Sequence, residues 1–135
     1  MVNPNFLDTN ILIYGVAETG RKSEIAEQLM ADRGAISIQV LNELASVLRR
    51  RFKMEWRKVL EIITTILTRC PEPQPITLEV HLRALRICER YALSIYDGLI
   101  VASALEAGCR VLYTEDLQHG QVIEGLRIEN PFVGI

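Results

Sequence analysis

A single carboxylate interrupts the first apolar run of the chain. The stretch from Asn5 to Tyr14 reads NFLDTNILIY, so Asp8 separates a short apolar segment suited to a buried strand from a second one that follows Thr9 and Asn10. We therefore expect Asp8 where a strand ends and a helix begins. In parallel α/β sheets, ligands bind at that edge. Alternatively, Asp8 or Asn10 simply caps the helix, as short polar residues often do.

Strand and helix patterns alternate along the rest of the chain. Apolar residues recur at helical spacing in five segments, over 22–32, 39–51, 54–67, 77–91 and 98–108. Short apolar runs predict three further strands, over 35–38, 109–114 and 126–129. Gly34 is expected to end the first of these helices, and Thr77 to cap the fourth. This alternation, without repeats, predicts a small α/β domain in which helices flank a parallel sheet.

The composition is that of a folded protein. The 135 residues suffice for one domain over 1–135, and a content of 49% hydrophobic and 24% charged residues argues against disorder. No apolar run approaches the roughly 18 residues of a membrane span, and the first residues lack the pattern of a signal peptide. We therefore expect a cytoplasmic protein with no membrane partner.

Cysteine content and net charge exclude several kinds of site. Cys70, Cys88 and Cys109 are odd in number, far apart and never spaced as C-x-x-C, which argues against disulfides, a zinc site or a redox pair. We expect them to be small core residues. The net charge of −2 gives no overall attraction to nucleic acid, so a polyanionic partner requires a local basic patch or a bound cation.

Three more acids occupy positions comparable to that of Asp8. Glu43 borders the apolar arc of its helix, Asp97 lies in the first turn of a helix that should be buried all round, and Asp116 directly follows a buried strand. Each has a structural alternative: a surface ion pair for Glu43, a favourable helix-dipole position for Asp97 and a turn for Asp116. Together they can point into one cleft.

Four carboxylates in one cleft need a counter-charge to stay ionised together. Mg²⁺ or Mn²⁺ is the usual solution, because these ions prefer oxygen ligands and keep coordination sites for water and phosphate. Such a site can activate water and stabilise the charge of a phosphate under attack, with one metal or two. The acids therefore predict metal-dependent phosphate chemistry.

The acids stand in an order that resembles a known family. FLDTN, NEL, YDGLIVA and TEDL follow one another in the order seen in PIN-domain ribonucleases, and the chain looks most like the VapC toxins of toxin–antitoxin pairs. The resemblance implies a three-layer α/β/α fold and an Mg²⁺- or Mn²⁺-dependent endoribonuclease that hydrolyses RNA phosphodiester bonds. It also implies a cognate antitoxin and a homodimer.

The resemblance assigns a role to particular residues. The catalytic and metal-binding acids match Asp8, Glu43, Asp97 and Asp116. Asn10 and Thr114 match supporting polar positions. A further acid that some members carry after the fourth is missing here, where the chain reads Gln118-His119-Gly120, so the number of metals stays open. His119 either contacts a phosphate or is a surface residue.

Other classes of function fit less well. An aspartyl phosphatase is disfavoured, because no second acid stands two residues after Asp8, and no G-x-G-x-x-G or P-loop motif supports a nucleotide site. Two alternatives within the family stay open. The chain is then either an RNA-processing nuclease without an antitoxin or a non-catalytic module that binds RNA or protein.

Two surfaces are candidates for partners. Arg50 and Lys53 belong to a basic run that includes Phe52 and Trp56, and we predict that they contact RNA; the alternative is that these cations merely favour a helix C-terminus. The apolar helix faces around 11–14 and 25–30 exceed the expected needs of one small core. They are predicted to receive an antitoxin segment or a second copy, unless they pack in the core.

Overall fold

Six helices surround a small sheet in the computed structural model, which describes residues 5–135. Val2, which the apolar pattern adds to the first strand, lies outside the described residues. The helices are α1 (Thr9–Ala17), α2 (Arg21–Ala31), α3 (Ile38–Arg50), α4 (Trp56–Arg69), α5 (Leu78–Tyr91) and α6 (Ile95–Glu106). The strands are β1 (Asn5–Leu7), β2 (Val111–Tyr113), β3 (Val122–Ile123) and β4 (Leu126–Glu129). The predicted α/β class is therefore confirmed.

The sheet is mixed, which corrects the expectation of a parallel sheet. Its order is β1-β2-β4-β3, with β1, β2 and β4 parallel and β3 antiparallel to β4. The sequence pattern missed β3 because it is two residues long. Glu124 and Gly125 connect β3 to β4 with φ of 49° and 89°, the paired positive φ values of a tight hairpin turn.

The segment 35–38 is shorter than a strand. Ala35 pairs with β1, donating to Asn5 O at 2.8 Å and accepting from Leu7 N at 2.9 Å, but only isolated bridges form. Ser37 then caps α3, because its hydroxyl accepts a hydrogen bond from Val40 N at 3.2 Å. The helix thus begins at Ile38, one residue earlier than predicted, and ends this extended segment.

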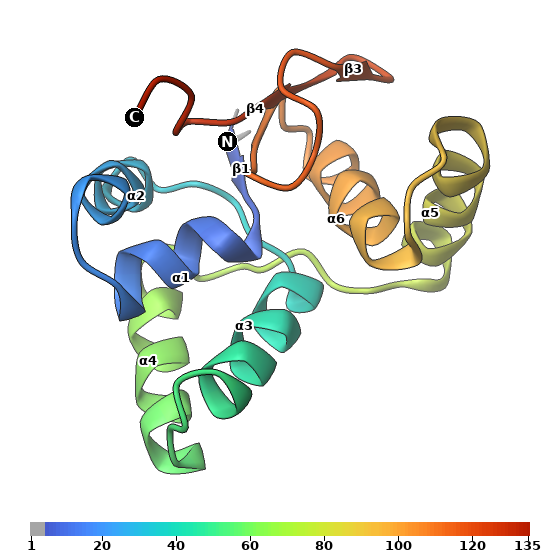
Figure 1. Cartoon of the computed structure of the whole chain (residues 1–135). Helices are drawn as coiled ribbons and strands as arrows, with labels where there is room; N and C mark the ends of the chain where they lie inside the picture. Colours follow the sequence, from blue (N-terminus) through green and yellow to red (C-terminus); the bar gives the residue numbers. More distant parts are fainter. Residues whose placement is uncertain (1–4) are drawn as a thin grey trace.

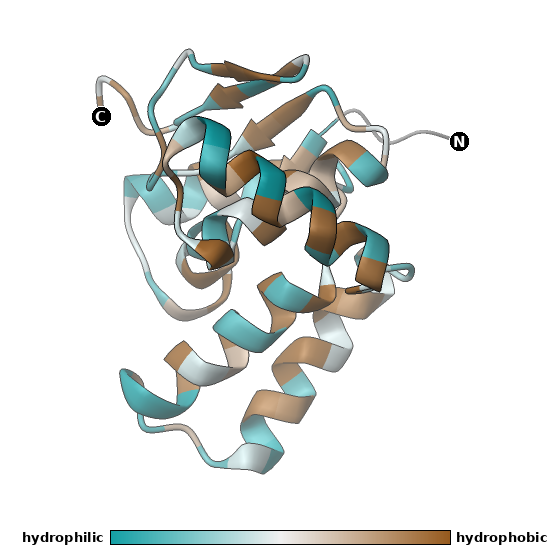
Figure 2. Cartoon of the chain, turned by 90° about the vertical axis from the view of Figure 1, so that its right-hand side faces the viewer, coloured by the Kyte–Doolittle hydropathy of each residue, from teal (hydrophilic) through white to brown (hydrophobic). Residues whose placement is uncertain are grey.

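Helices lie on both sides of the strands. Figure 1 shows α1 and α2 on one side, α5 and α6 on the other, and the pair α3 and α4 projecting away from the sheet. Figure 2 shows polar and apolar residues alternating around the turns of that projecting pair, as expected for helices with one buried face. The strand ends at Leu7 and Tyr113 lie where β1 and β2 run into the helical layers.

Helix α6 is buried over most of its length, as its uncharged sequence predicted. Every residue from Gly98 to Ala104 is buried. Gly98 permits close contact with α5, since a Cβ there would lie 2.3 Å from Cys88 Sγ and 3.0 Å from Ala84 O. The glycine that follows Asp97 therefore lets α5 and α6 approach closely, and this contact holds the Asp97 turn against the core.

The cysteines and the apolar residues of α5 were expected in the core, and the structure buries only some of them. Cys70 and Cys109 are buried and Cys88 is half-buried; all three are free thiols. On α5, Leu82 and Leu85 face solvent rather than the core, which receives Val80, Ala84 and Ile87 instead. Across the described residues, no helix combines the length and the apolar character needed to cross a bilayer.

Candidate active site

Asp8 lies at the junction of β1 and α1 and is only 4% exposed. Its Oδ1 accepts a hydrogen bond from Thr9 N at 2.6 Å, so it does cap α1. Its Oδ2 accepts a second bond, at 2.7 Å, from the hydroxyl of Thr114 at the end of β2. Capping therefore accounts for one oxygen only, and the other is aimed at the neighbouring strand end.

Thr114 and Asn10 connect the two strand ends. Because the Thr114 hydroxyl gives its one proton to Asp8, it acts as acceptor for Asp116 N at 3.1 Å. Asn10 Nδ2 donates to Asp116 Oδ2 at 3.0 Å, and Asn10 Oδ1 accepts from Glu115 N at 3.2 Å. The start of α1 and the loop after β2 thus form one polar network that fixes Asp8 relative to Asp116.

Glu43 and Asp97 approach from two other helices. Glu43 Oε2 accepts a hydrogen bond from Gln39 Nε2 at 2.9 Å, one turn earlier on α3. Asp97 lies in the first turn of α6, where its backbone N donates to the Ser94 hydroxyl at 3.2 Å. Both acids are half-buried, whereas Asp116 is exposed. The four acids therefore come from four separate segments.

The charges of the four acids act on one another. Burial raises the pKa of Asp8 to about 7, the hydrogen bonds from Thr114 and Thr9 oppose this rise, and the charges of Glu43 and Asp116 add to it. Burial also raises the pKa of Glu43, assisted by Asp97 and Asp116. Because unscreened repulsion of this kind requires proximity, the acids share one electrostatic neighbourhood.

Asp97 follows the same rule. Its pKa is raised by burial and by the charge of Asp116, against the opposing hydrogen bond with Ser94. All these shifts disfavour the ionised carboxylates, and a nearby cation would reverse them. The mutual repulsion of these acids would therefore be relieved by a bound cation, and the metal site expected from the sequence stays a prediction.

A cavity of about 280 Å³ opens onto the cluster. Glu43 and Asp116 line it, whereas Asp8 is buried and Asp97 does not line it. Beside Glu43, Thr9 Oγ1 is buried and makes no hydrogen bond with the described residues, although it is close enough to lower the Glu43 pKa slightly. In the arrangement shown by residues 5–135, no three acidic, histidine or cysteine side chains stand close enough together to hold one ion.

Glu115 is a residue of the site that sequence reasoning missed. Its carboxylate accepts hydrogen bonds from Tyr14 Oη at 2.7 Å and from Lys22 Nζ. Burial acts the other way, but these two donors lower the pKa of Glu115. Lys22 also lies 5.3 Å from the centre of the Phe132 ring, so the pair anchors the loop after β2 to α2 and to the C-terminal segment.

Three residues named from the sequence lie apart from the acids. Arg50 Nε donates to Ser46 Oγ at 3.0 Å, and Arg50 lines a separate cavity beside Arg49 and Trp56. Lys53 is exposed, with φ of 58°. His119 is exposed as well, and its Nδ1 accepts a hydrogen bond from Asn130 N at 3.0 Å, which is a structural role.

Among the described residues, Arg51 is the basic residue that lines the acid cavity, and the acid Glu18 lines it as well. Glu43, Val47 and Arg51 are spaced four residues apart on α3, so they share one face of that helix. Helical register is the local signal that could have identified Arg51 from the sequence. Glu18 had no such signal, because its partner lies 33 residues away.

Comparison with known proteins identifies the family and the fold of the chain. The family model described as the PIN domain matches residues 6–124. No curated protein matches the sequence significantly. A toxin–antitoxin complex from Klebsiella pneumoniae contains a chain that is 24% identical, with a TM-score of 0.70 and coverage of 95% of this chain and 98% of that one.

Two further solved structures share the fold. VapC20 from Mycobacterium tuberculosis, a toxin that cleaves the sarcin–ricin loop, is 21% identical, with a TM-score of 0.67 and coverage of 83% and 89%. VapBC2 from Rickettsia felis, bound to a fragment of promoter DNA, includes a chain that is 21% identical, with a TM-score of 0.68 and coverage of 93% and 97%. Likeness at such identities establishes the fold.

Proposed function

The chain belongs to the PIN-domain family, and on that premise we propose that it is a metal-dependent endoribonuclease, the toxin of a toxin–antitoxin pair. The observation on which the proposal rests is the cluster of Asp8, Glu43, Asp97 and Asp116, whose charges act on one another beside a cavity that Glu43 and Asp116 line. RNA phosphodiester hydrolysis is the chemistry that such a carboxylate site supports best.

The donor set fits a hard divalent cation. PIN nucleases generally use divalent metal ions, and the oxygen-only side chains here suit Mg²⁺ or Mn²⁺ better than a transition metal that prefers nitrogen or sulfur. Asp8, Asp97 and Asp116 would hold the ion, with Glu43 completing the site. Asp116 is exposed and Glu43 and Asp97 are half-buried, so all three carboxylates can be reached from solvent. In the described residues no three of these side chains are close enough to hold one ion, so metal binding would have to draw them together. The bound ion would polarise a phosphate and a water molecule.

The supporting residues keep the acids in position. Thr114 and Thr9 N hold both oxygens of Asp8, so the orientation of this carboxylate is set before RNA arrives. Asn10 holds Asp116 Oδ2. Burial raises the pKa of Glu43, which makes its carboxylate a stronger base for accepting a proton from the attacking water.

Metal binding and RNA cleavage test the proposal together. We expect Asp97→Asn to bind Mn²⁺ more weakly than the wild type in calorimetry and to lose RNA cleavage. The matched control is Glu61→Gln, which removes an exposed acid on α4 and should change neither result. Equal Mn²⁺ affinity in Asp97→Asn and the wild type would remove the metal site from the proposal.

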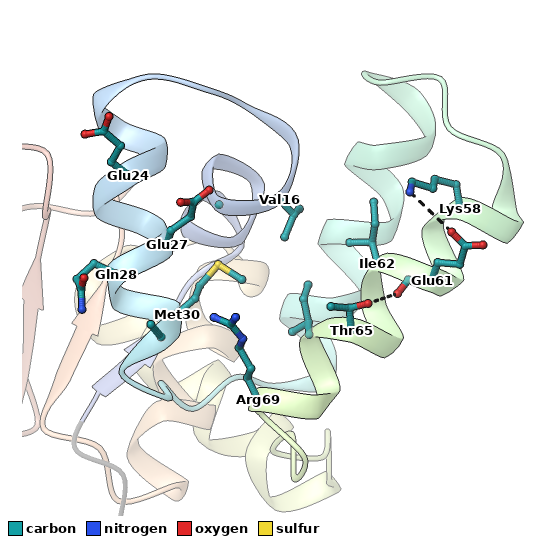
Figure 3. A pocket seen from close by; sticks show the side chains of 13 residues that line it. Val16, Glu24, Glu27, Gln28, Met30, Lys58, Glu61, Ile62, Thr65 and Arg69 are labelled. Atoms are coloured by element: carbon teal, nitrogen blue, oxygen red, sulfur yellow. Dashed lines mark hydrogen bonds and ion pairs between the residues drawn. The ribbon is translucent and has the colours of Figure 1, made fainter.

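The antitoxin partner fits a groove of about 680 Å³ between α2 and α4. Figure 3 shows Met30 and Glu27 facing Ile62 and Arg69 across this groove. Glu27 and Arg69 make no ion pair within the described part of the chain, so each can receive an oppositely charged side chain. A peptide with an apolar residue flanked by a basic and an acidic one would match the groove.

This placement narrows the predicted partner surface. Ile11, Leu12 and Ile13 are buried in the core, so Tyr14 is the one residue of the predicted 11–14 face that is partly exposed. Met30 of α2 does line the groove.

The protein encoded by the neighbouring reading frame is the probe to use. Coexpression of the chain with that protein should relieve growth arrest and RNA cleavage. Growth arrest that persists despite a stable complex would favour an RNA-processing nuclease. A wild-type protein that never cleaves RNA would favour a non-catalytic module.

The proposed homodimer has a candidate surface on α5. Leu78, Leu82 and Leu85 recur at helical spacing and are 73%, 44% and 46% exposed. Such a stripe is unusual for a monomer and would be covered by the same stripe of a second copy, as two-fold symmetry requires. Leu82→Lys should lower the sedimentation coefficient to that of a monomer without loss of folding, whereas an unchanged coefficient would place the dimer elsewhere.

A further inference from the structure

The acid cavity has one basic residue among the described residues that line it. Arg51 is the C-cap of α3, and its Nη2 lies 2.6 Å from Oε1 of Glu18, at the end of α1. Both residues line the cavity with Glu43 and Asp116. Arg51 is 56% exposed in its side chain and Glu18 is 27% exposed, so the pair occupies the rim rather than the floor.

The helix places Arg51 at a defined distance from the acids. Glu43 and Arg51 lie eight residues apart on one face of α3, which corresponds to about 12 Å along the helix axis. Arg51 is therefore too far along the helix to join the carboxylate cluster. It is placed instead to meet a phosphate that flanks the bond being cut.

The pairing of Arg51 with Glu18 is easy to exchange. Ion pairs exposed to this extent contribute little to stability, because water and salt screen them. The guanidinium lies 4.8 Å from the centre of the Phe52 ring, so its face is supported while its N–H edge stays available to acceptors. Phosphate oxygens can accept two parallel hydrogen bonds from one arginine, as carboxylates can, so a phosphate is a ready substitute for Glu18.

A second cavity continues from the rim. It has a volume of about 660 Å³ and shares Tyr14 and Glu18 with the acid cavity. Lys22 and Phe52 also line it, so it offers an ammonium group and an aromatic ring beyond the Arg51–Glu18 pair. Cationic and aromatic side chains along one path are the features by which proteins hold single-stranded nucleic acid.

We propose that Arg51 binds an RNA phosphate next to the scissile one, and that Glu18 is a positioning residue that holds Arg51 at the rim until RNA displaces it. This inference rests on the proposed function, because it requires RNA in the acid cavity. It assigns phosphate binding to Arg51 instead of Arg50, which is bonded to Ser46 and lines a different cavity.

Binding of a short single-stranded oligoribonucleotide, measured by fluorescence anisotropy in EDTA, separates the proposal from a purely structural ion pair. Arg51→Gln should weaken binding and reduce the slope of log affinity against log salt by about 0.7, the value for one lost contact with a single strand. Glu18→Gln should instead tighten binding about two- to fivefold, because Arg51 no longer has a competing partner. A structural pair predicts that both variants change in the same direction.

Two matched variants control for position and for charge. Arg50→Gln removes a neighbouring cation and should leave the salt slope unchanged. Glu61→Gln removes an acid from an exposed pair with Lys58 on α4, far along the chain from the cavity, and should tighten binding less than Glu18→Gln does. Circular dichroism and thermal melts of all four variants establish that they are folded.

Cleavage kinetics distinguish failure of the inference from failure of the proposed function. Arg51→Gln should raise KM about tenfold while kcat is kept, as expected when uniform binding is lost. A wild type that binds and cleaves RNA, together with an Arg51→Gln variant of unchanged KM and salt slope, would overturn the inference alone. A wild type that neither binds nor cleaves RNA would overturn the proposed function, and the inference with it.

Discussion

The acid cavity and the α2–α4 groove differ in almost every respect. The groove is more than twice as large, at about 680 Å³ against 280 Å³, and is lined only by α1, α2 and α4. The acid cavity is lined by α1, α3 and the loop after β2. In the groove, Lys58 and Glu61 form an exposed pair with 3.7 Å between charged atoms. Around the acid cavity, Asp8 and Thr114 are buried and bonded at 2.7 Å.

The difference teaches that polar order, and not volume, marks the chemical site of this protein. Helix surfaces can leave a large groove wherever two of them diverge, and a partner can fill it. Buried carboxylates with raised pKa values have a free-energy cost in the folded state, and proteins keep such costs mainly where chemistry needs them. The smaller cavity is thus the one to test for catalysis, and the larger one for association.

The largest expected effect concerns catalysis. Asp8→Asn should reduce RNA cleavage by about 100-fold or more, because it removes a ligand charge from the centre of the cluster. Glu27→Gln in the groove should leave cleavage within about twofold, since an exposed acid far from the reaction contributes no transition-state charge. Initial rates on one RNA substrate measure both. A large loss in Glu27→Gln would break the division between the two cavities.

The second expected effect concerns the free energy of unfolding. The ionised Asp8 supports cleavage but lowers the stability of the fold. The pKa of Asp8 is about 7 in the folded protein, against the ordinary value of 3.8 that applies to the unfolded chain. Between these values the folded protein holds a proton that the unfolded chain has released, so stability falls as pH rises from about 4 to about 7 and stays lower above that. The loss is at most about 4 kcal/mol, at 1.36 kcal/mol per pKa unit.

Asp8→Asn removes this titration. Measured by urea unfolding in EDTA, its stability relative to the wild type should rise between pH 4.5 and pH 8. Glu61→Gln, which removes an exposed acid, serves as the control and should follow the wild-type pH profile. Parallel pH profiles for Asp8→Asn and the wild type would mean that the hydrogen bonds to Asp8 already stabilise its ionised form. The buried carboxylate would then not lower the free energy of unfolding.

The smallest expected effect concerns the groove. Ile62→Asp should weaken the complex with the neighbouring-frame protein about tenfold, which is 1.4 kcal/mol, because it places a charge where an apolar anchor would bind. RNA cleavage by the free variant should be unchanged. Lys58→Gln on the same helix is the control, since its ammonium is already paired and exposed. If calorimetry gives Ile62→Asp the same affinity as the wild type, the partner must bind a different surface.

Local chemistry made much of the fold predictable. Ser37, Thr77 and Ser94 each cap the helix that follows, and a short hydroxyl side chain before an apolar-periodic run is a local signal. The buried run in α6 was equally clear, because an uncharged helix has no side to turn to water. These features depend on residues within one or two turns of each other.

Other features depended on distant residues. The antiparallel β3 is two residues long and exists only because β4 is beside it. Leu82 and Leu85 belong to the apolar pattern of α5, yet the core had room for Val80, Ala84 and Ile87 alone. Periodicity indicates which face of a helix is apolar; it does not indicate how wide a face the neighbouring elements will cover.

The sequence by itself determined which acids stand at the ends of strands and the starts of helices, because turn chemistry and apolar periodicity are local and place Asp8, Asp97 and Asp116 within their elements. Tertiary structure alone decided their partners. Thr114 reaches Asp8 across 106 positions, Lys22 reaches Glu115 across 93, and Glu18 brings Arg51 rather than Arg50 to the cavity across 33. Hydrogen bonds and ion pairs at such separations form only after the strands and helices have packed, so no local pattern encodes them.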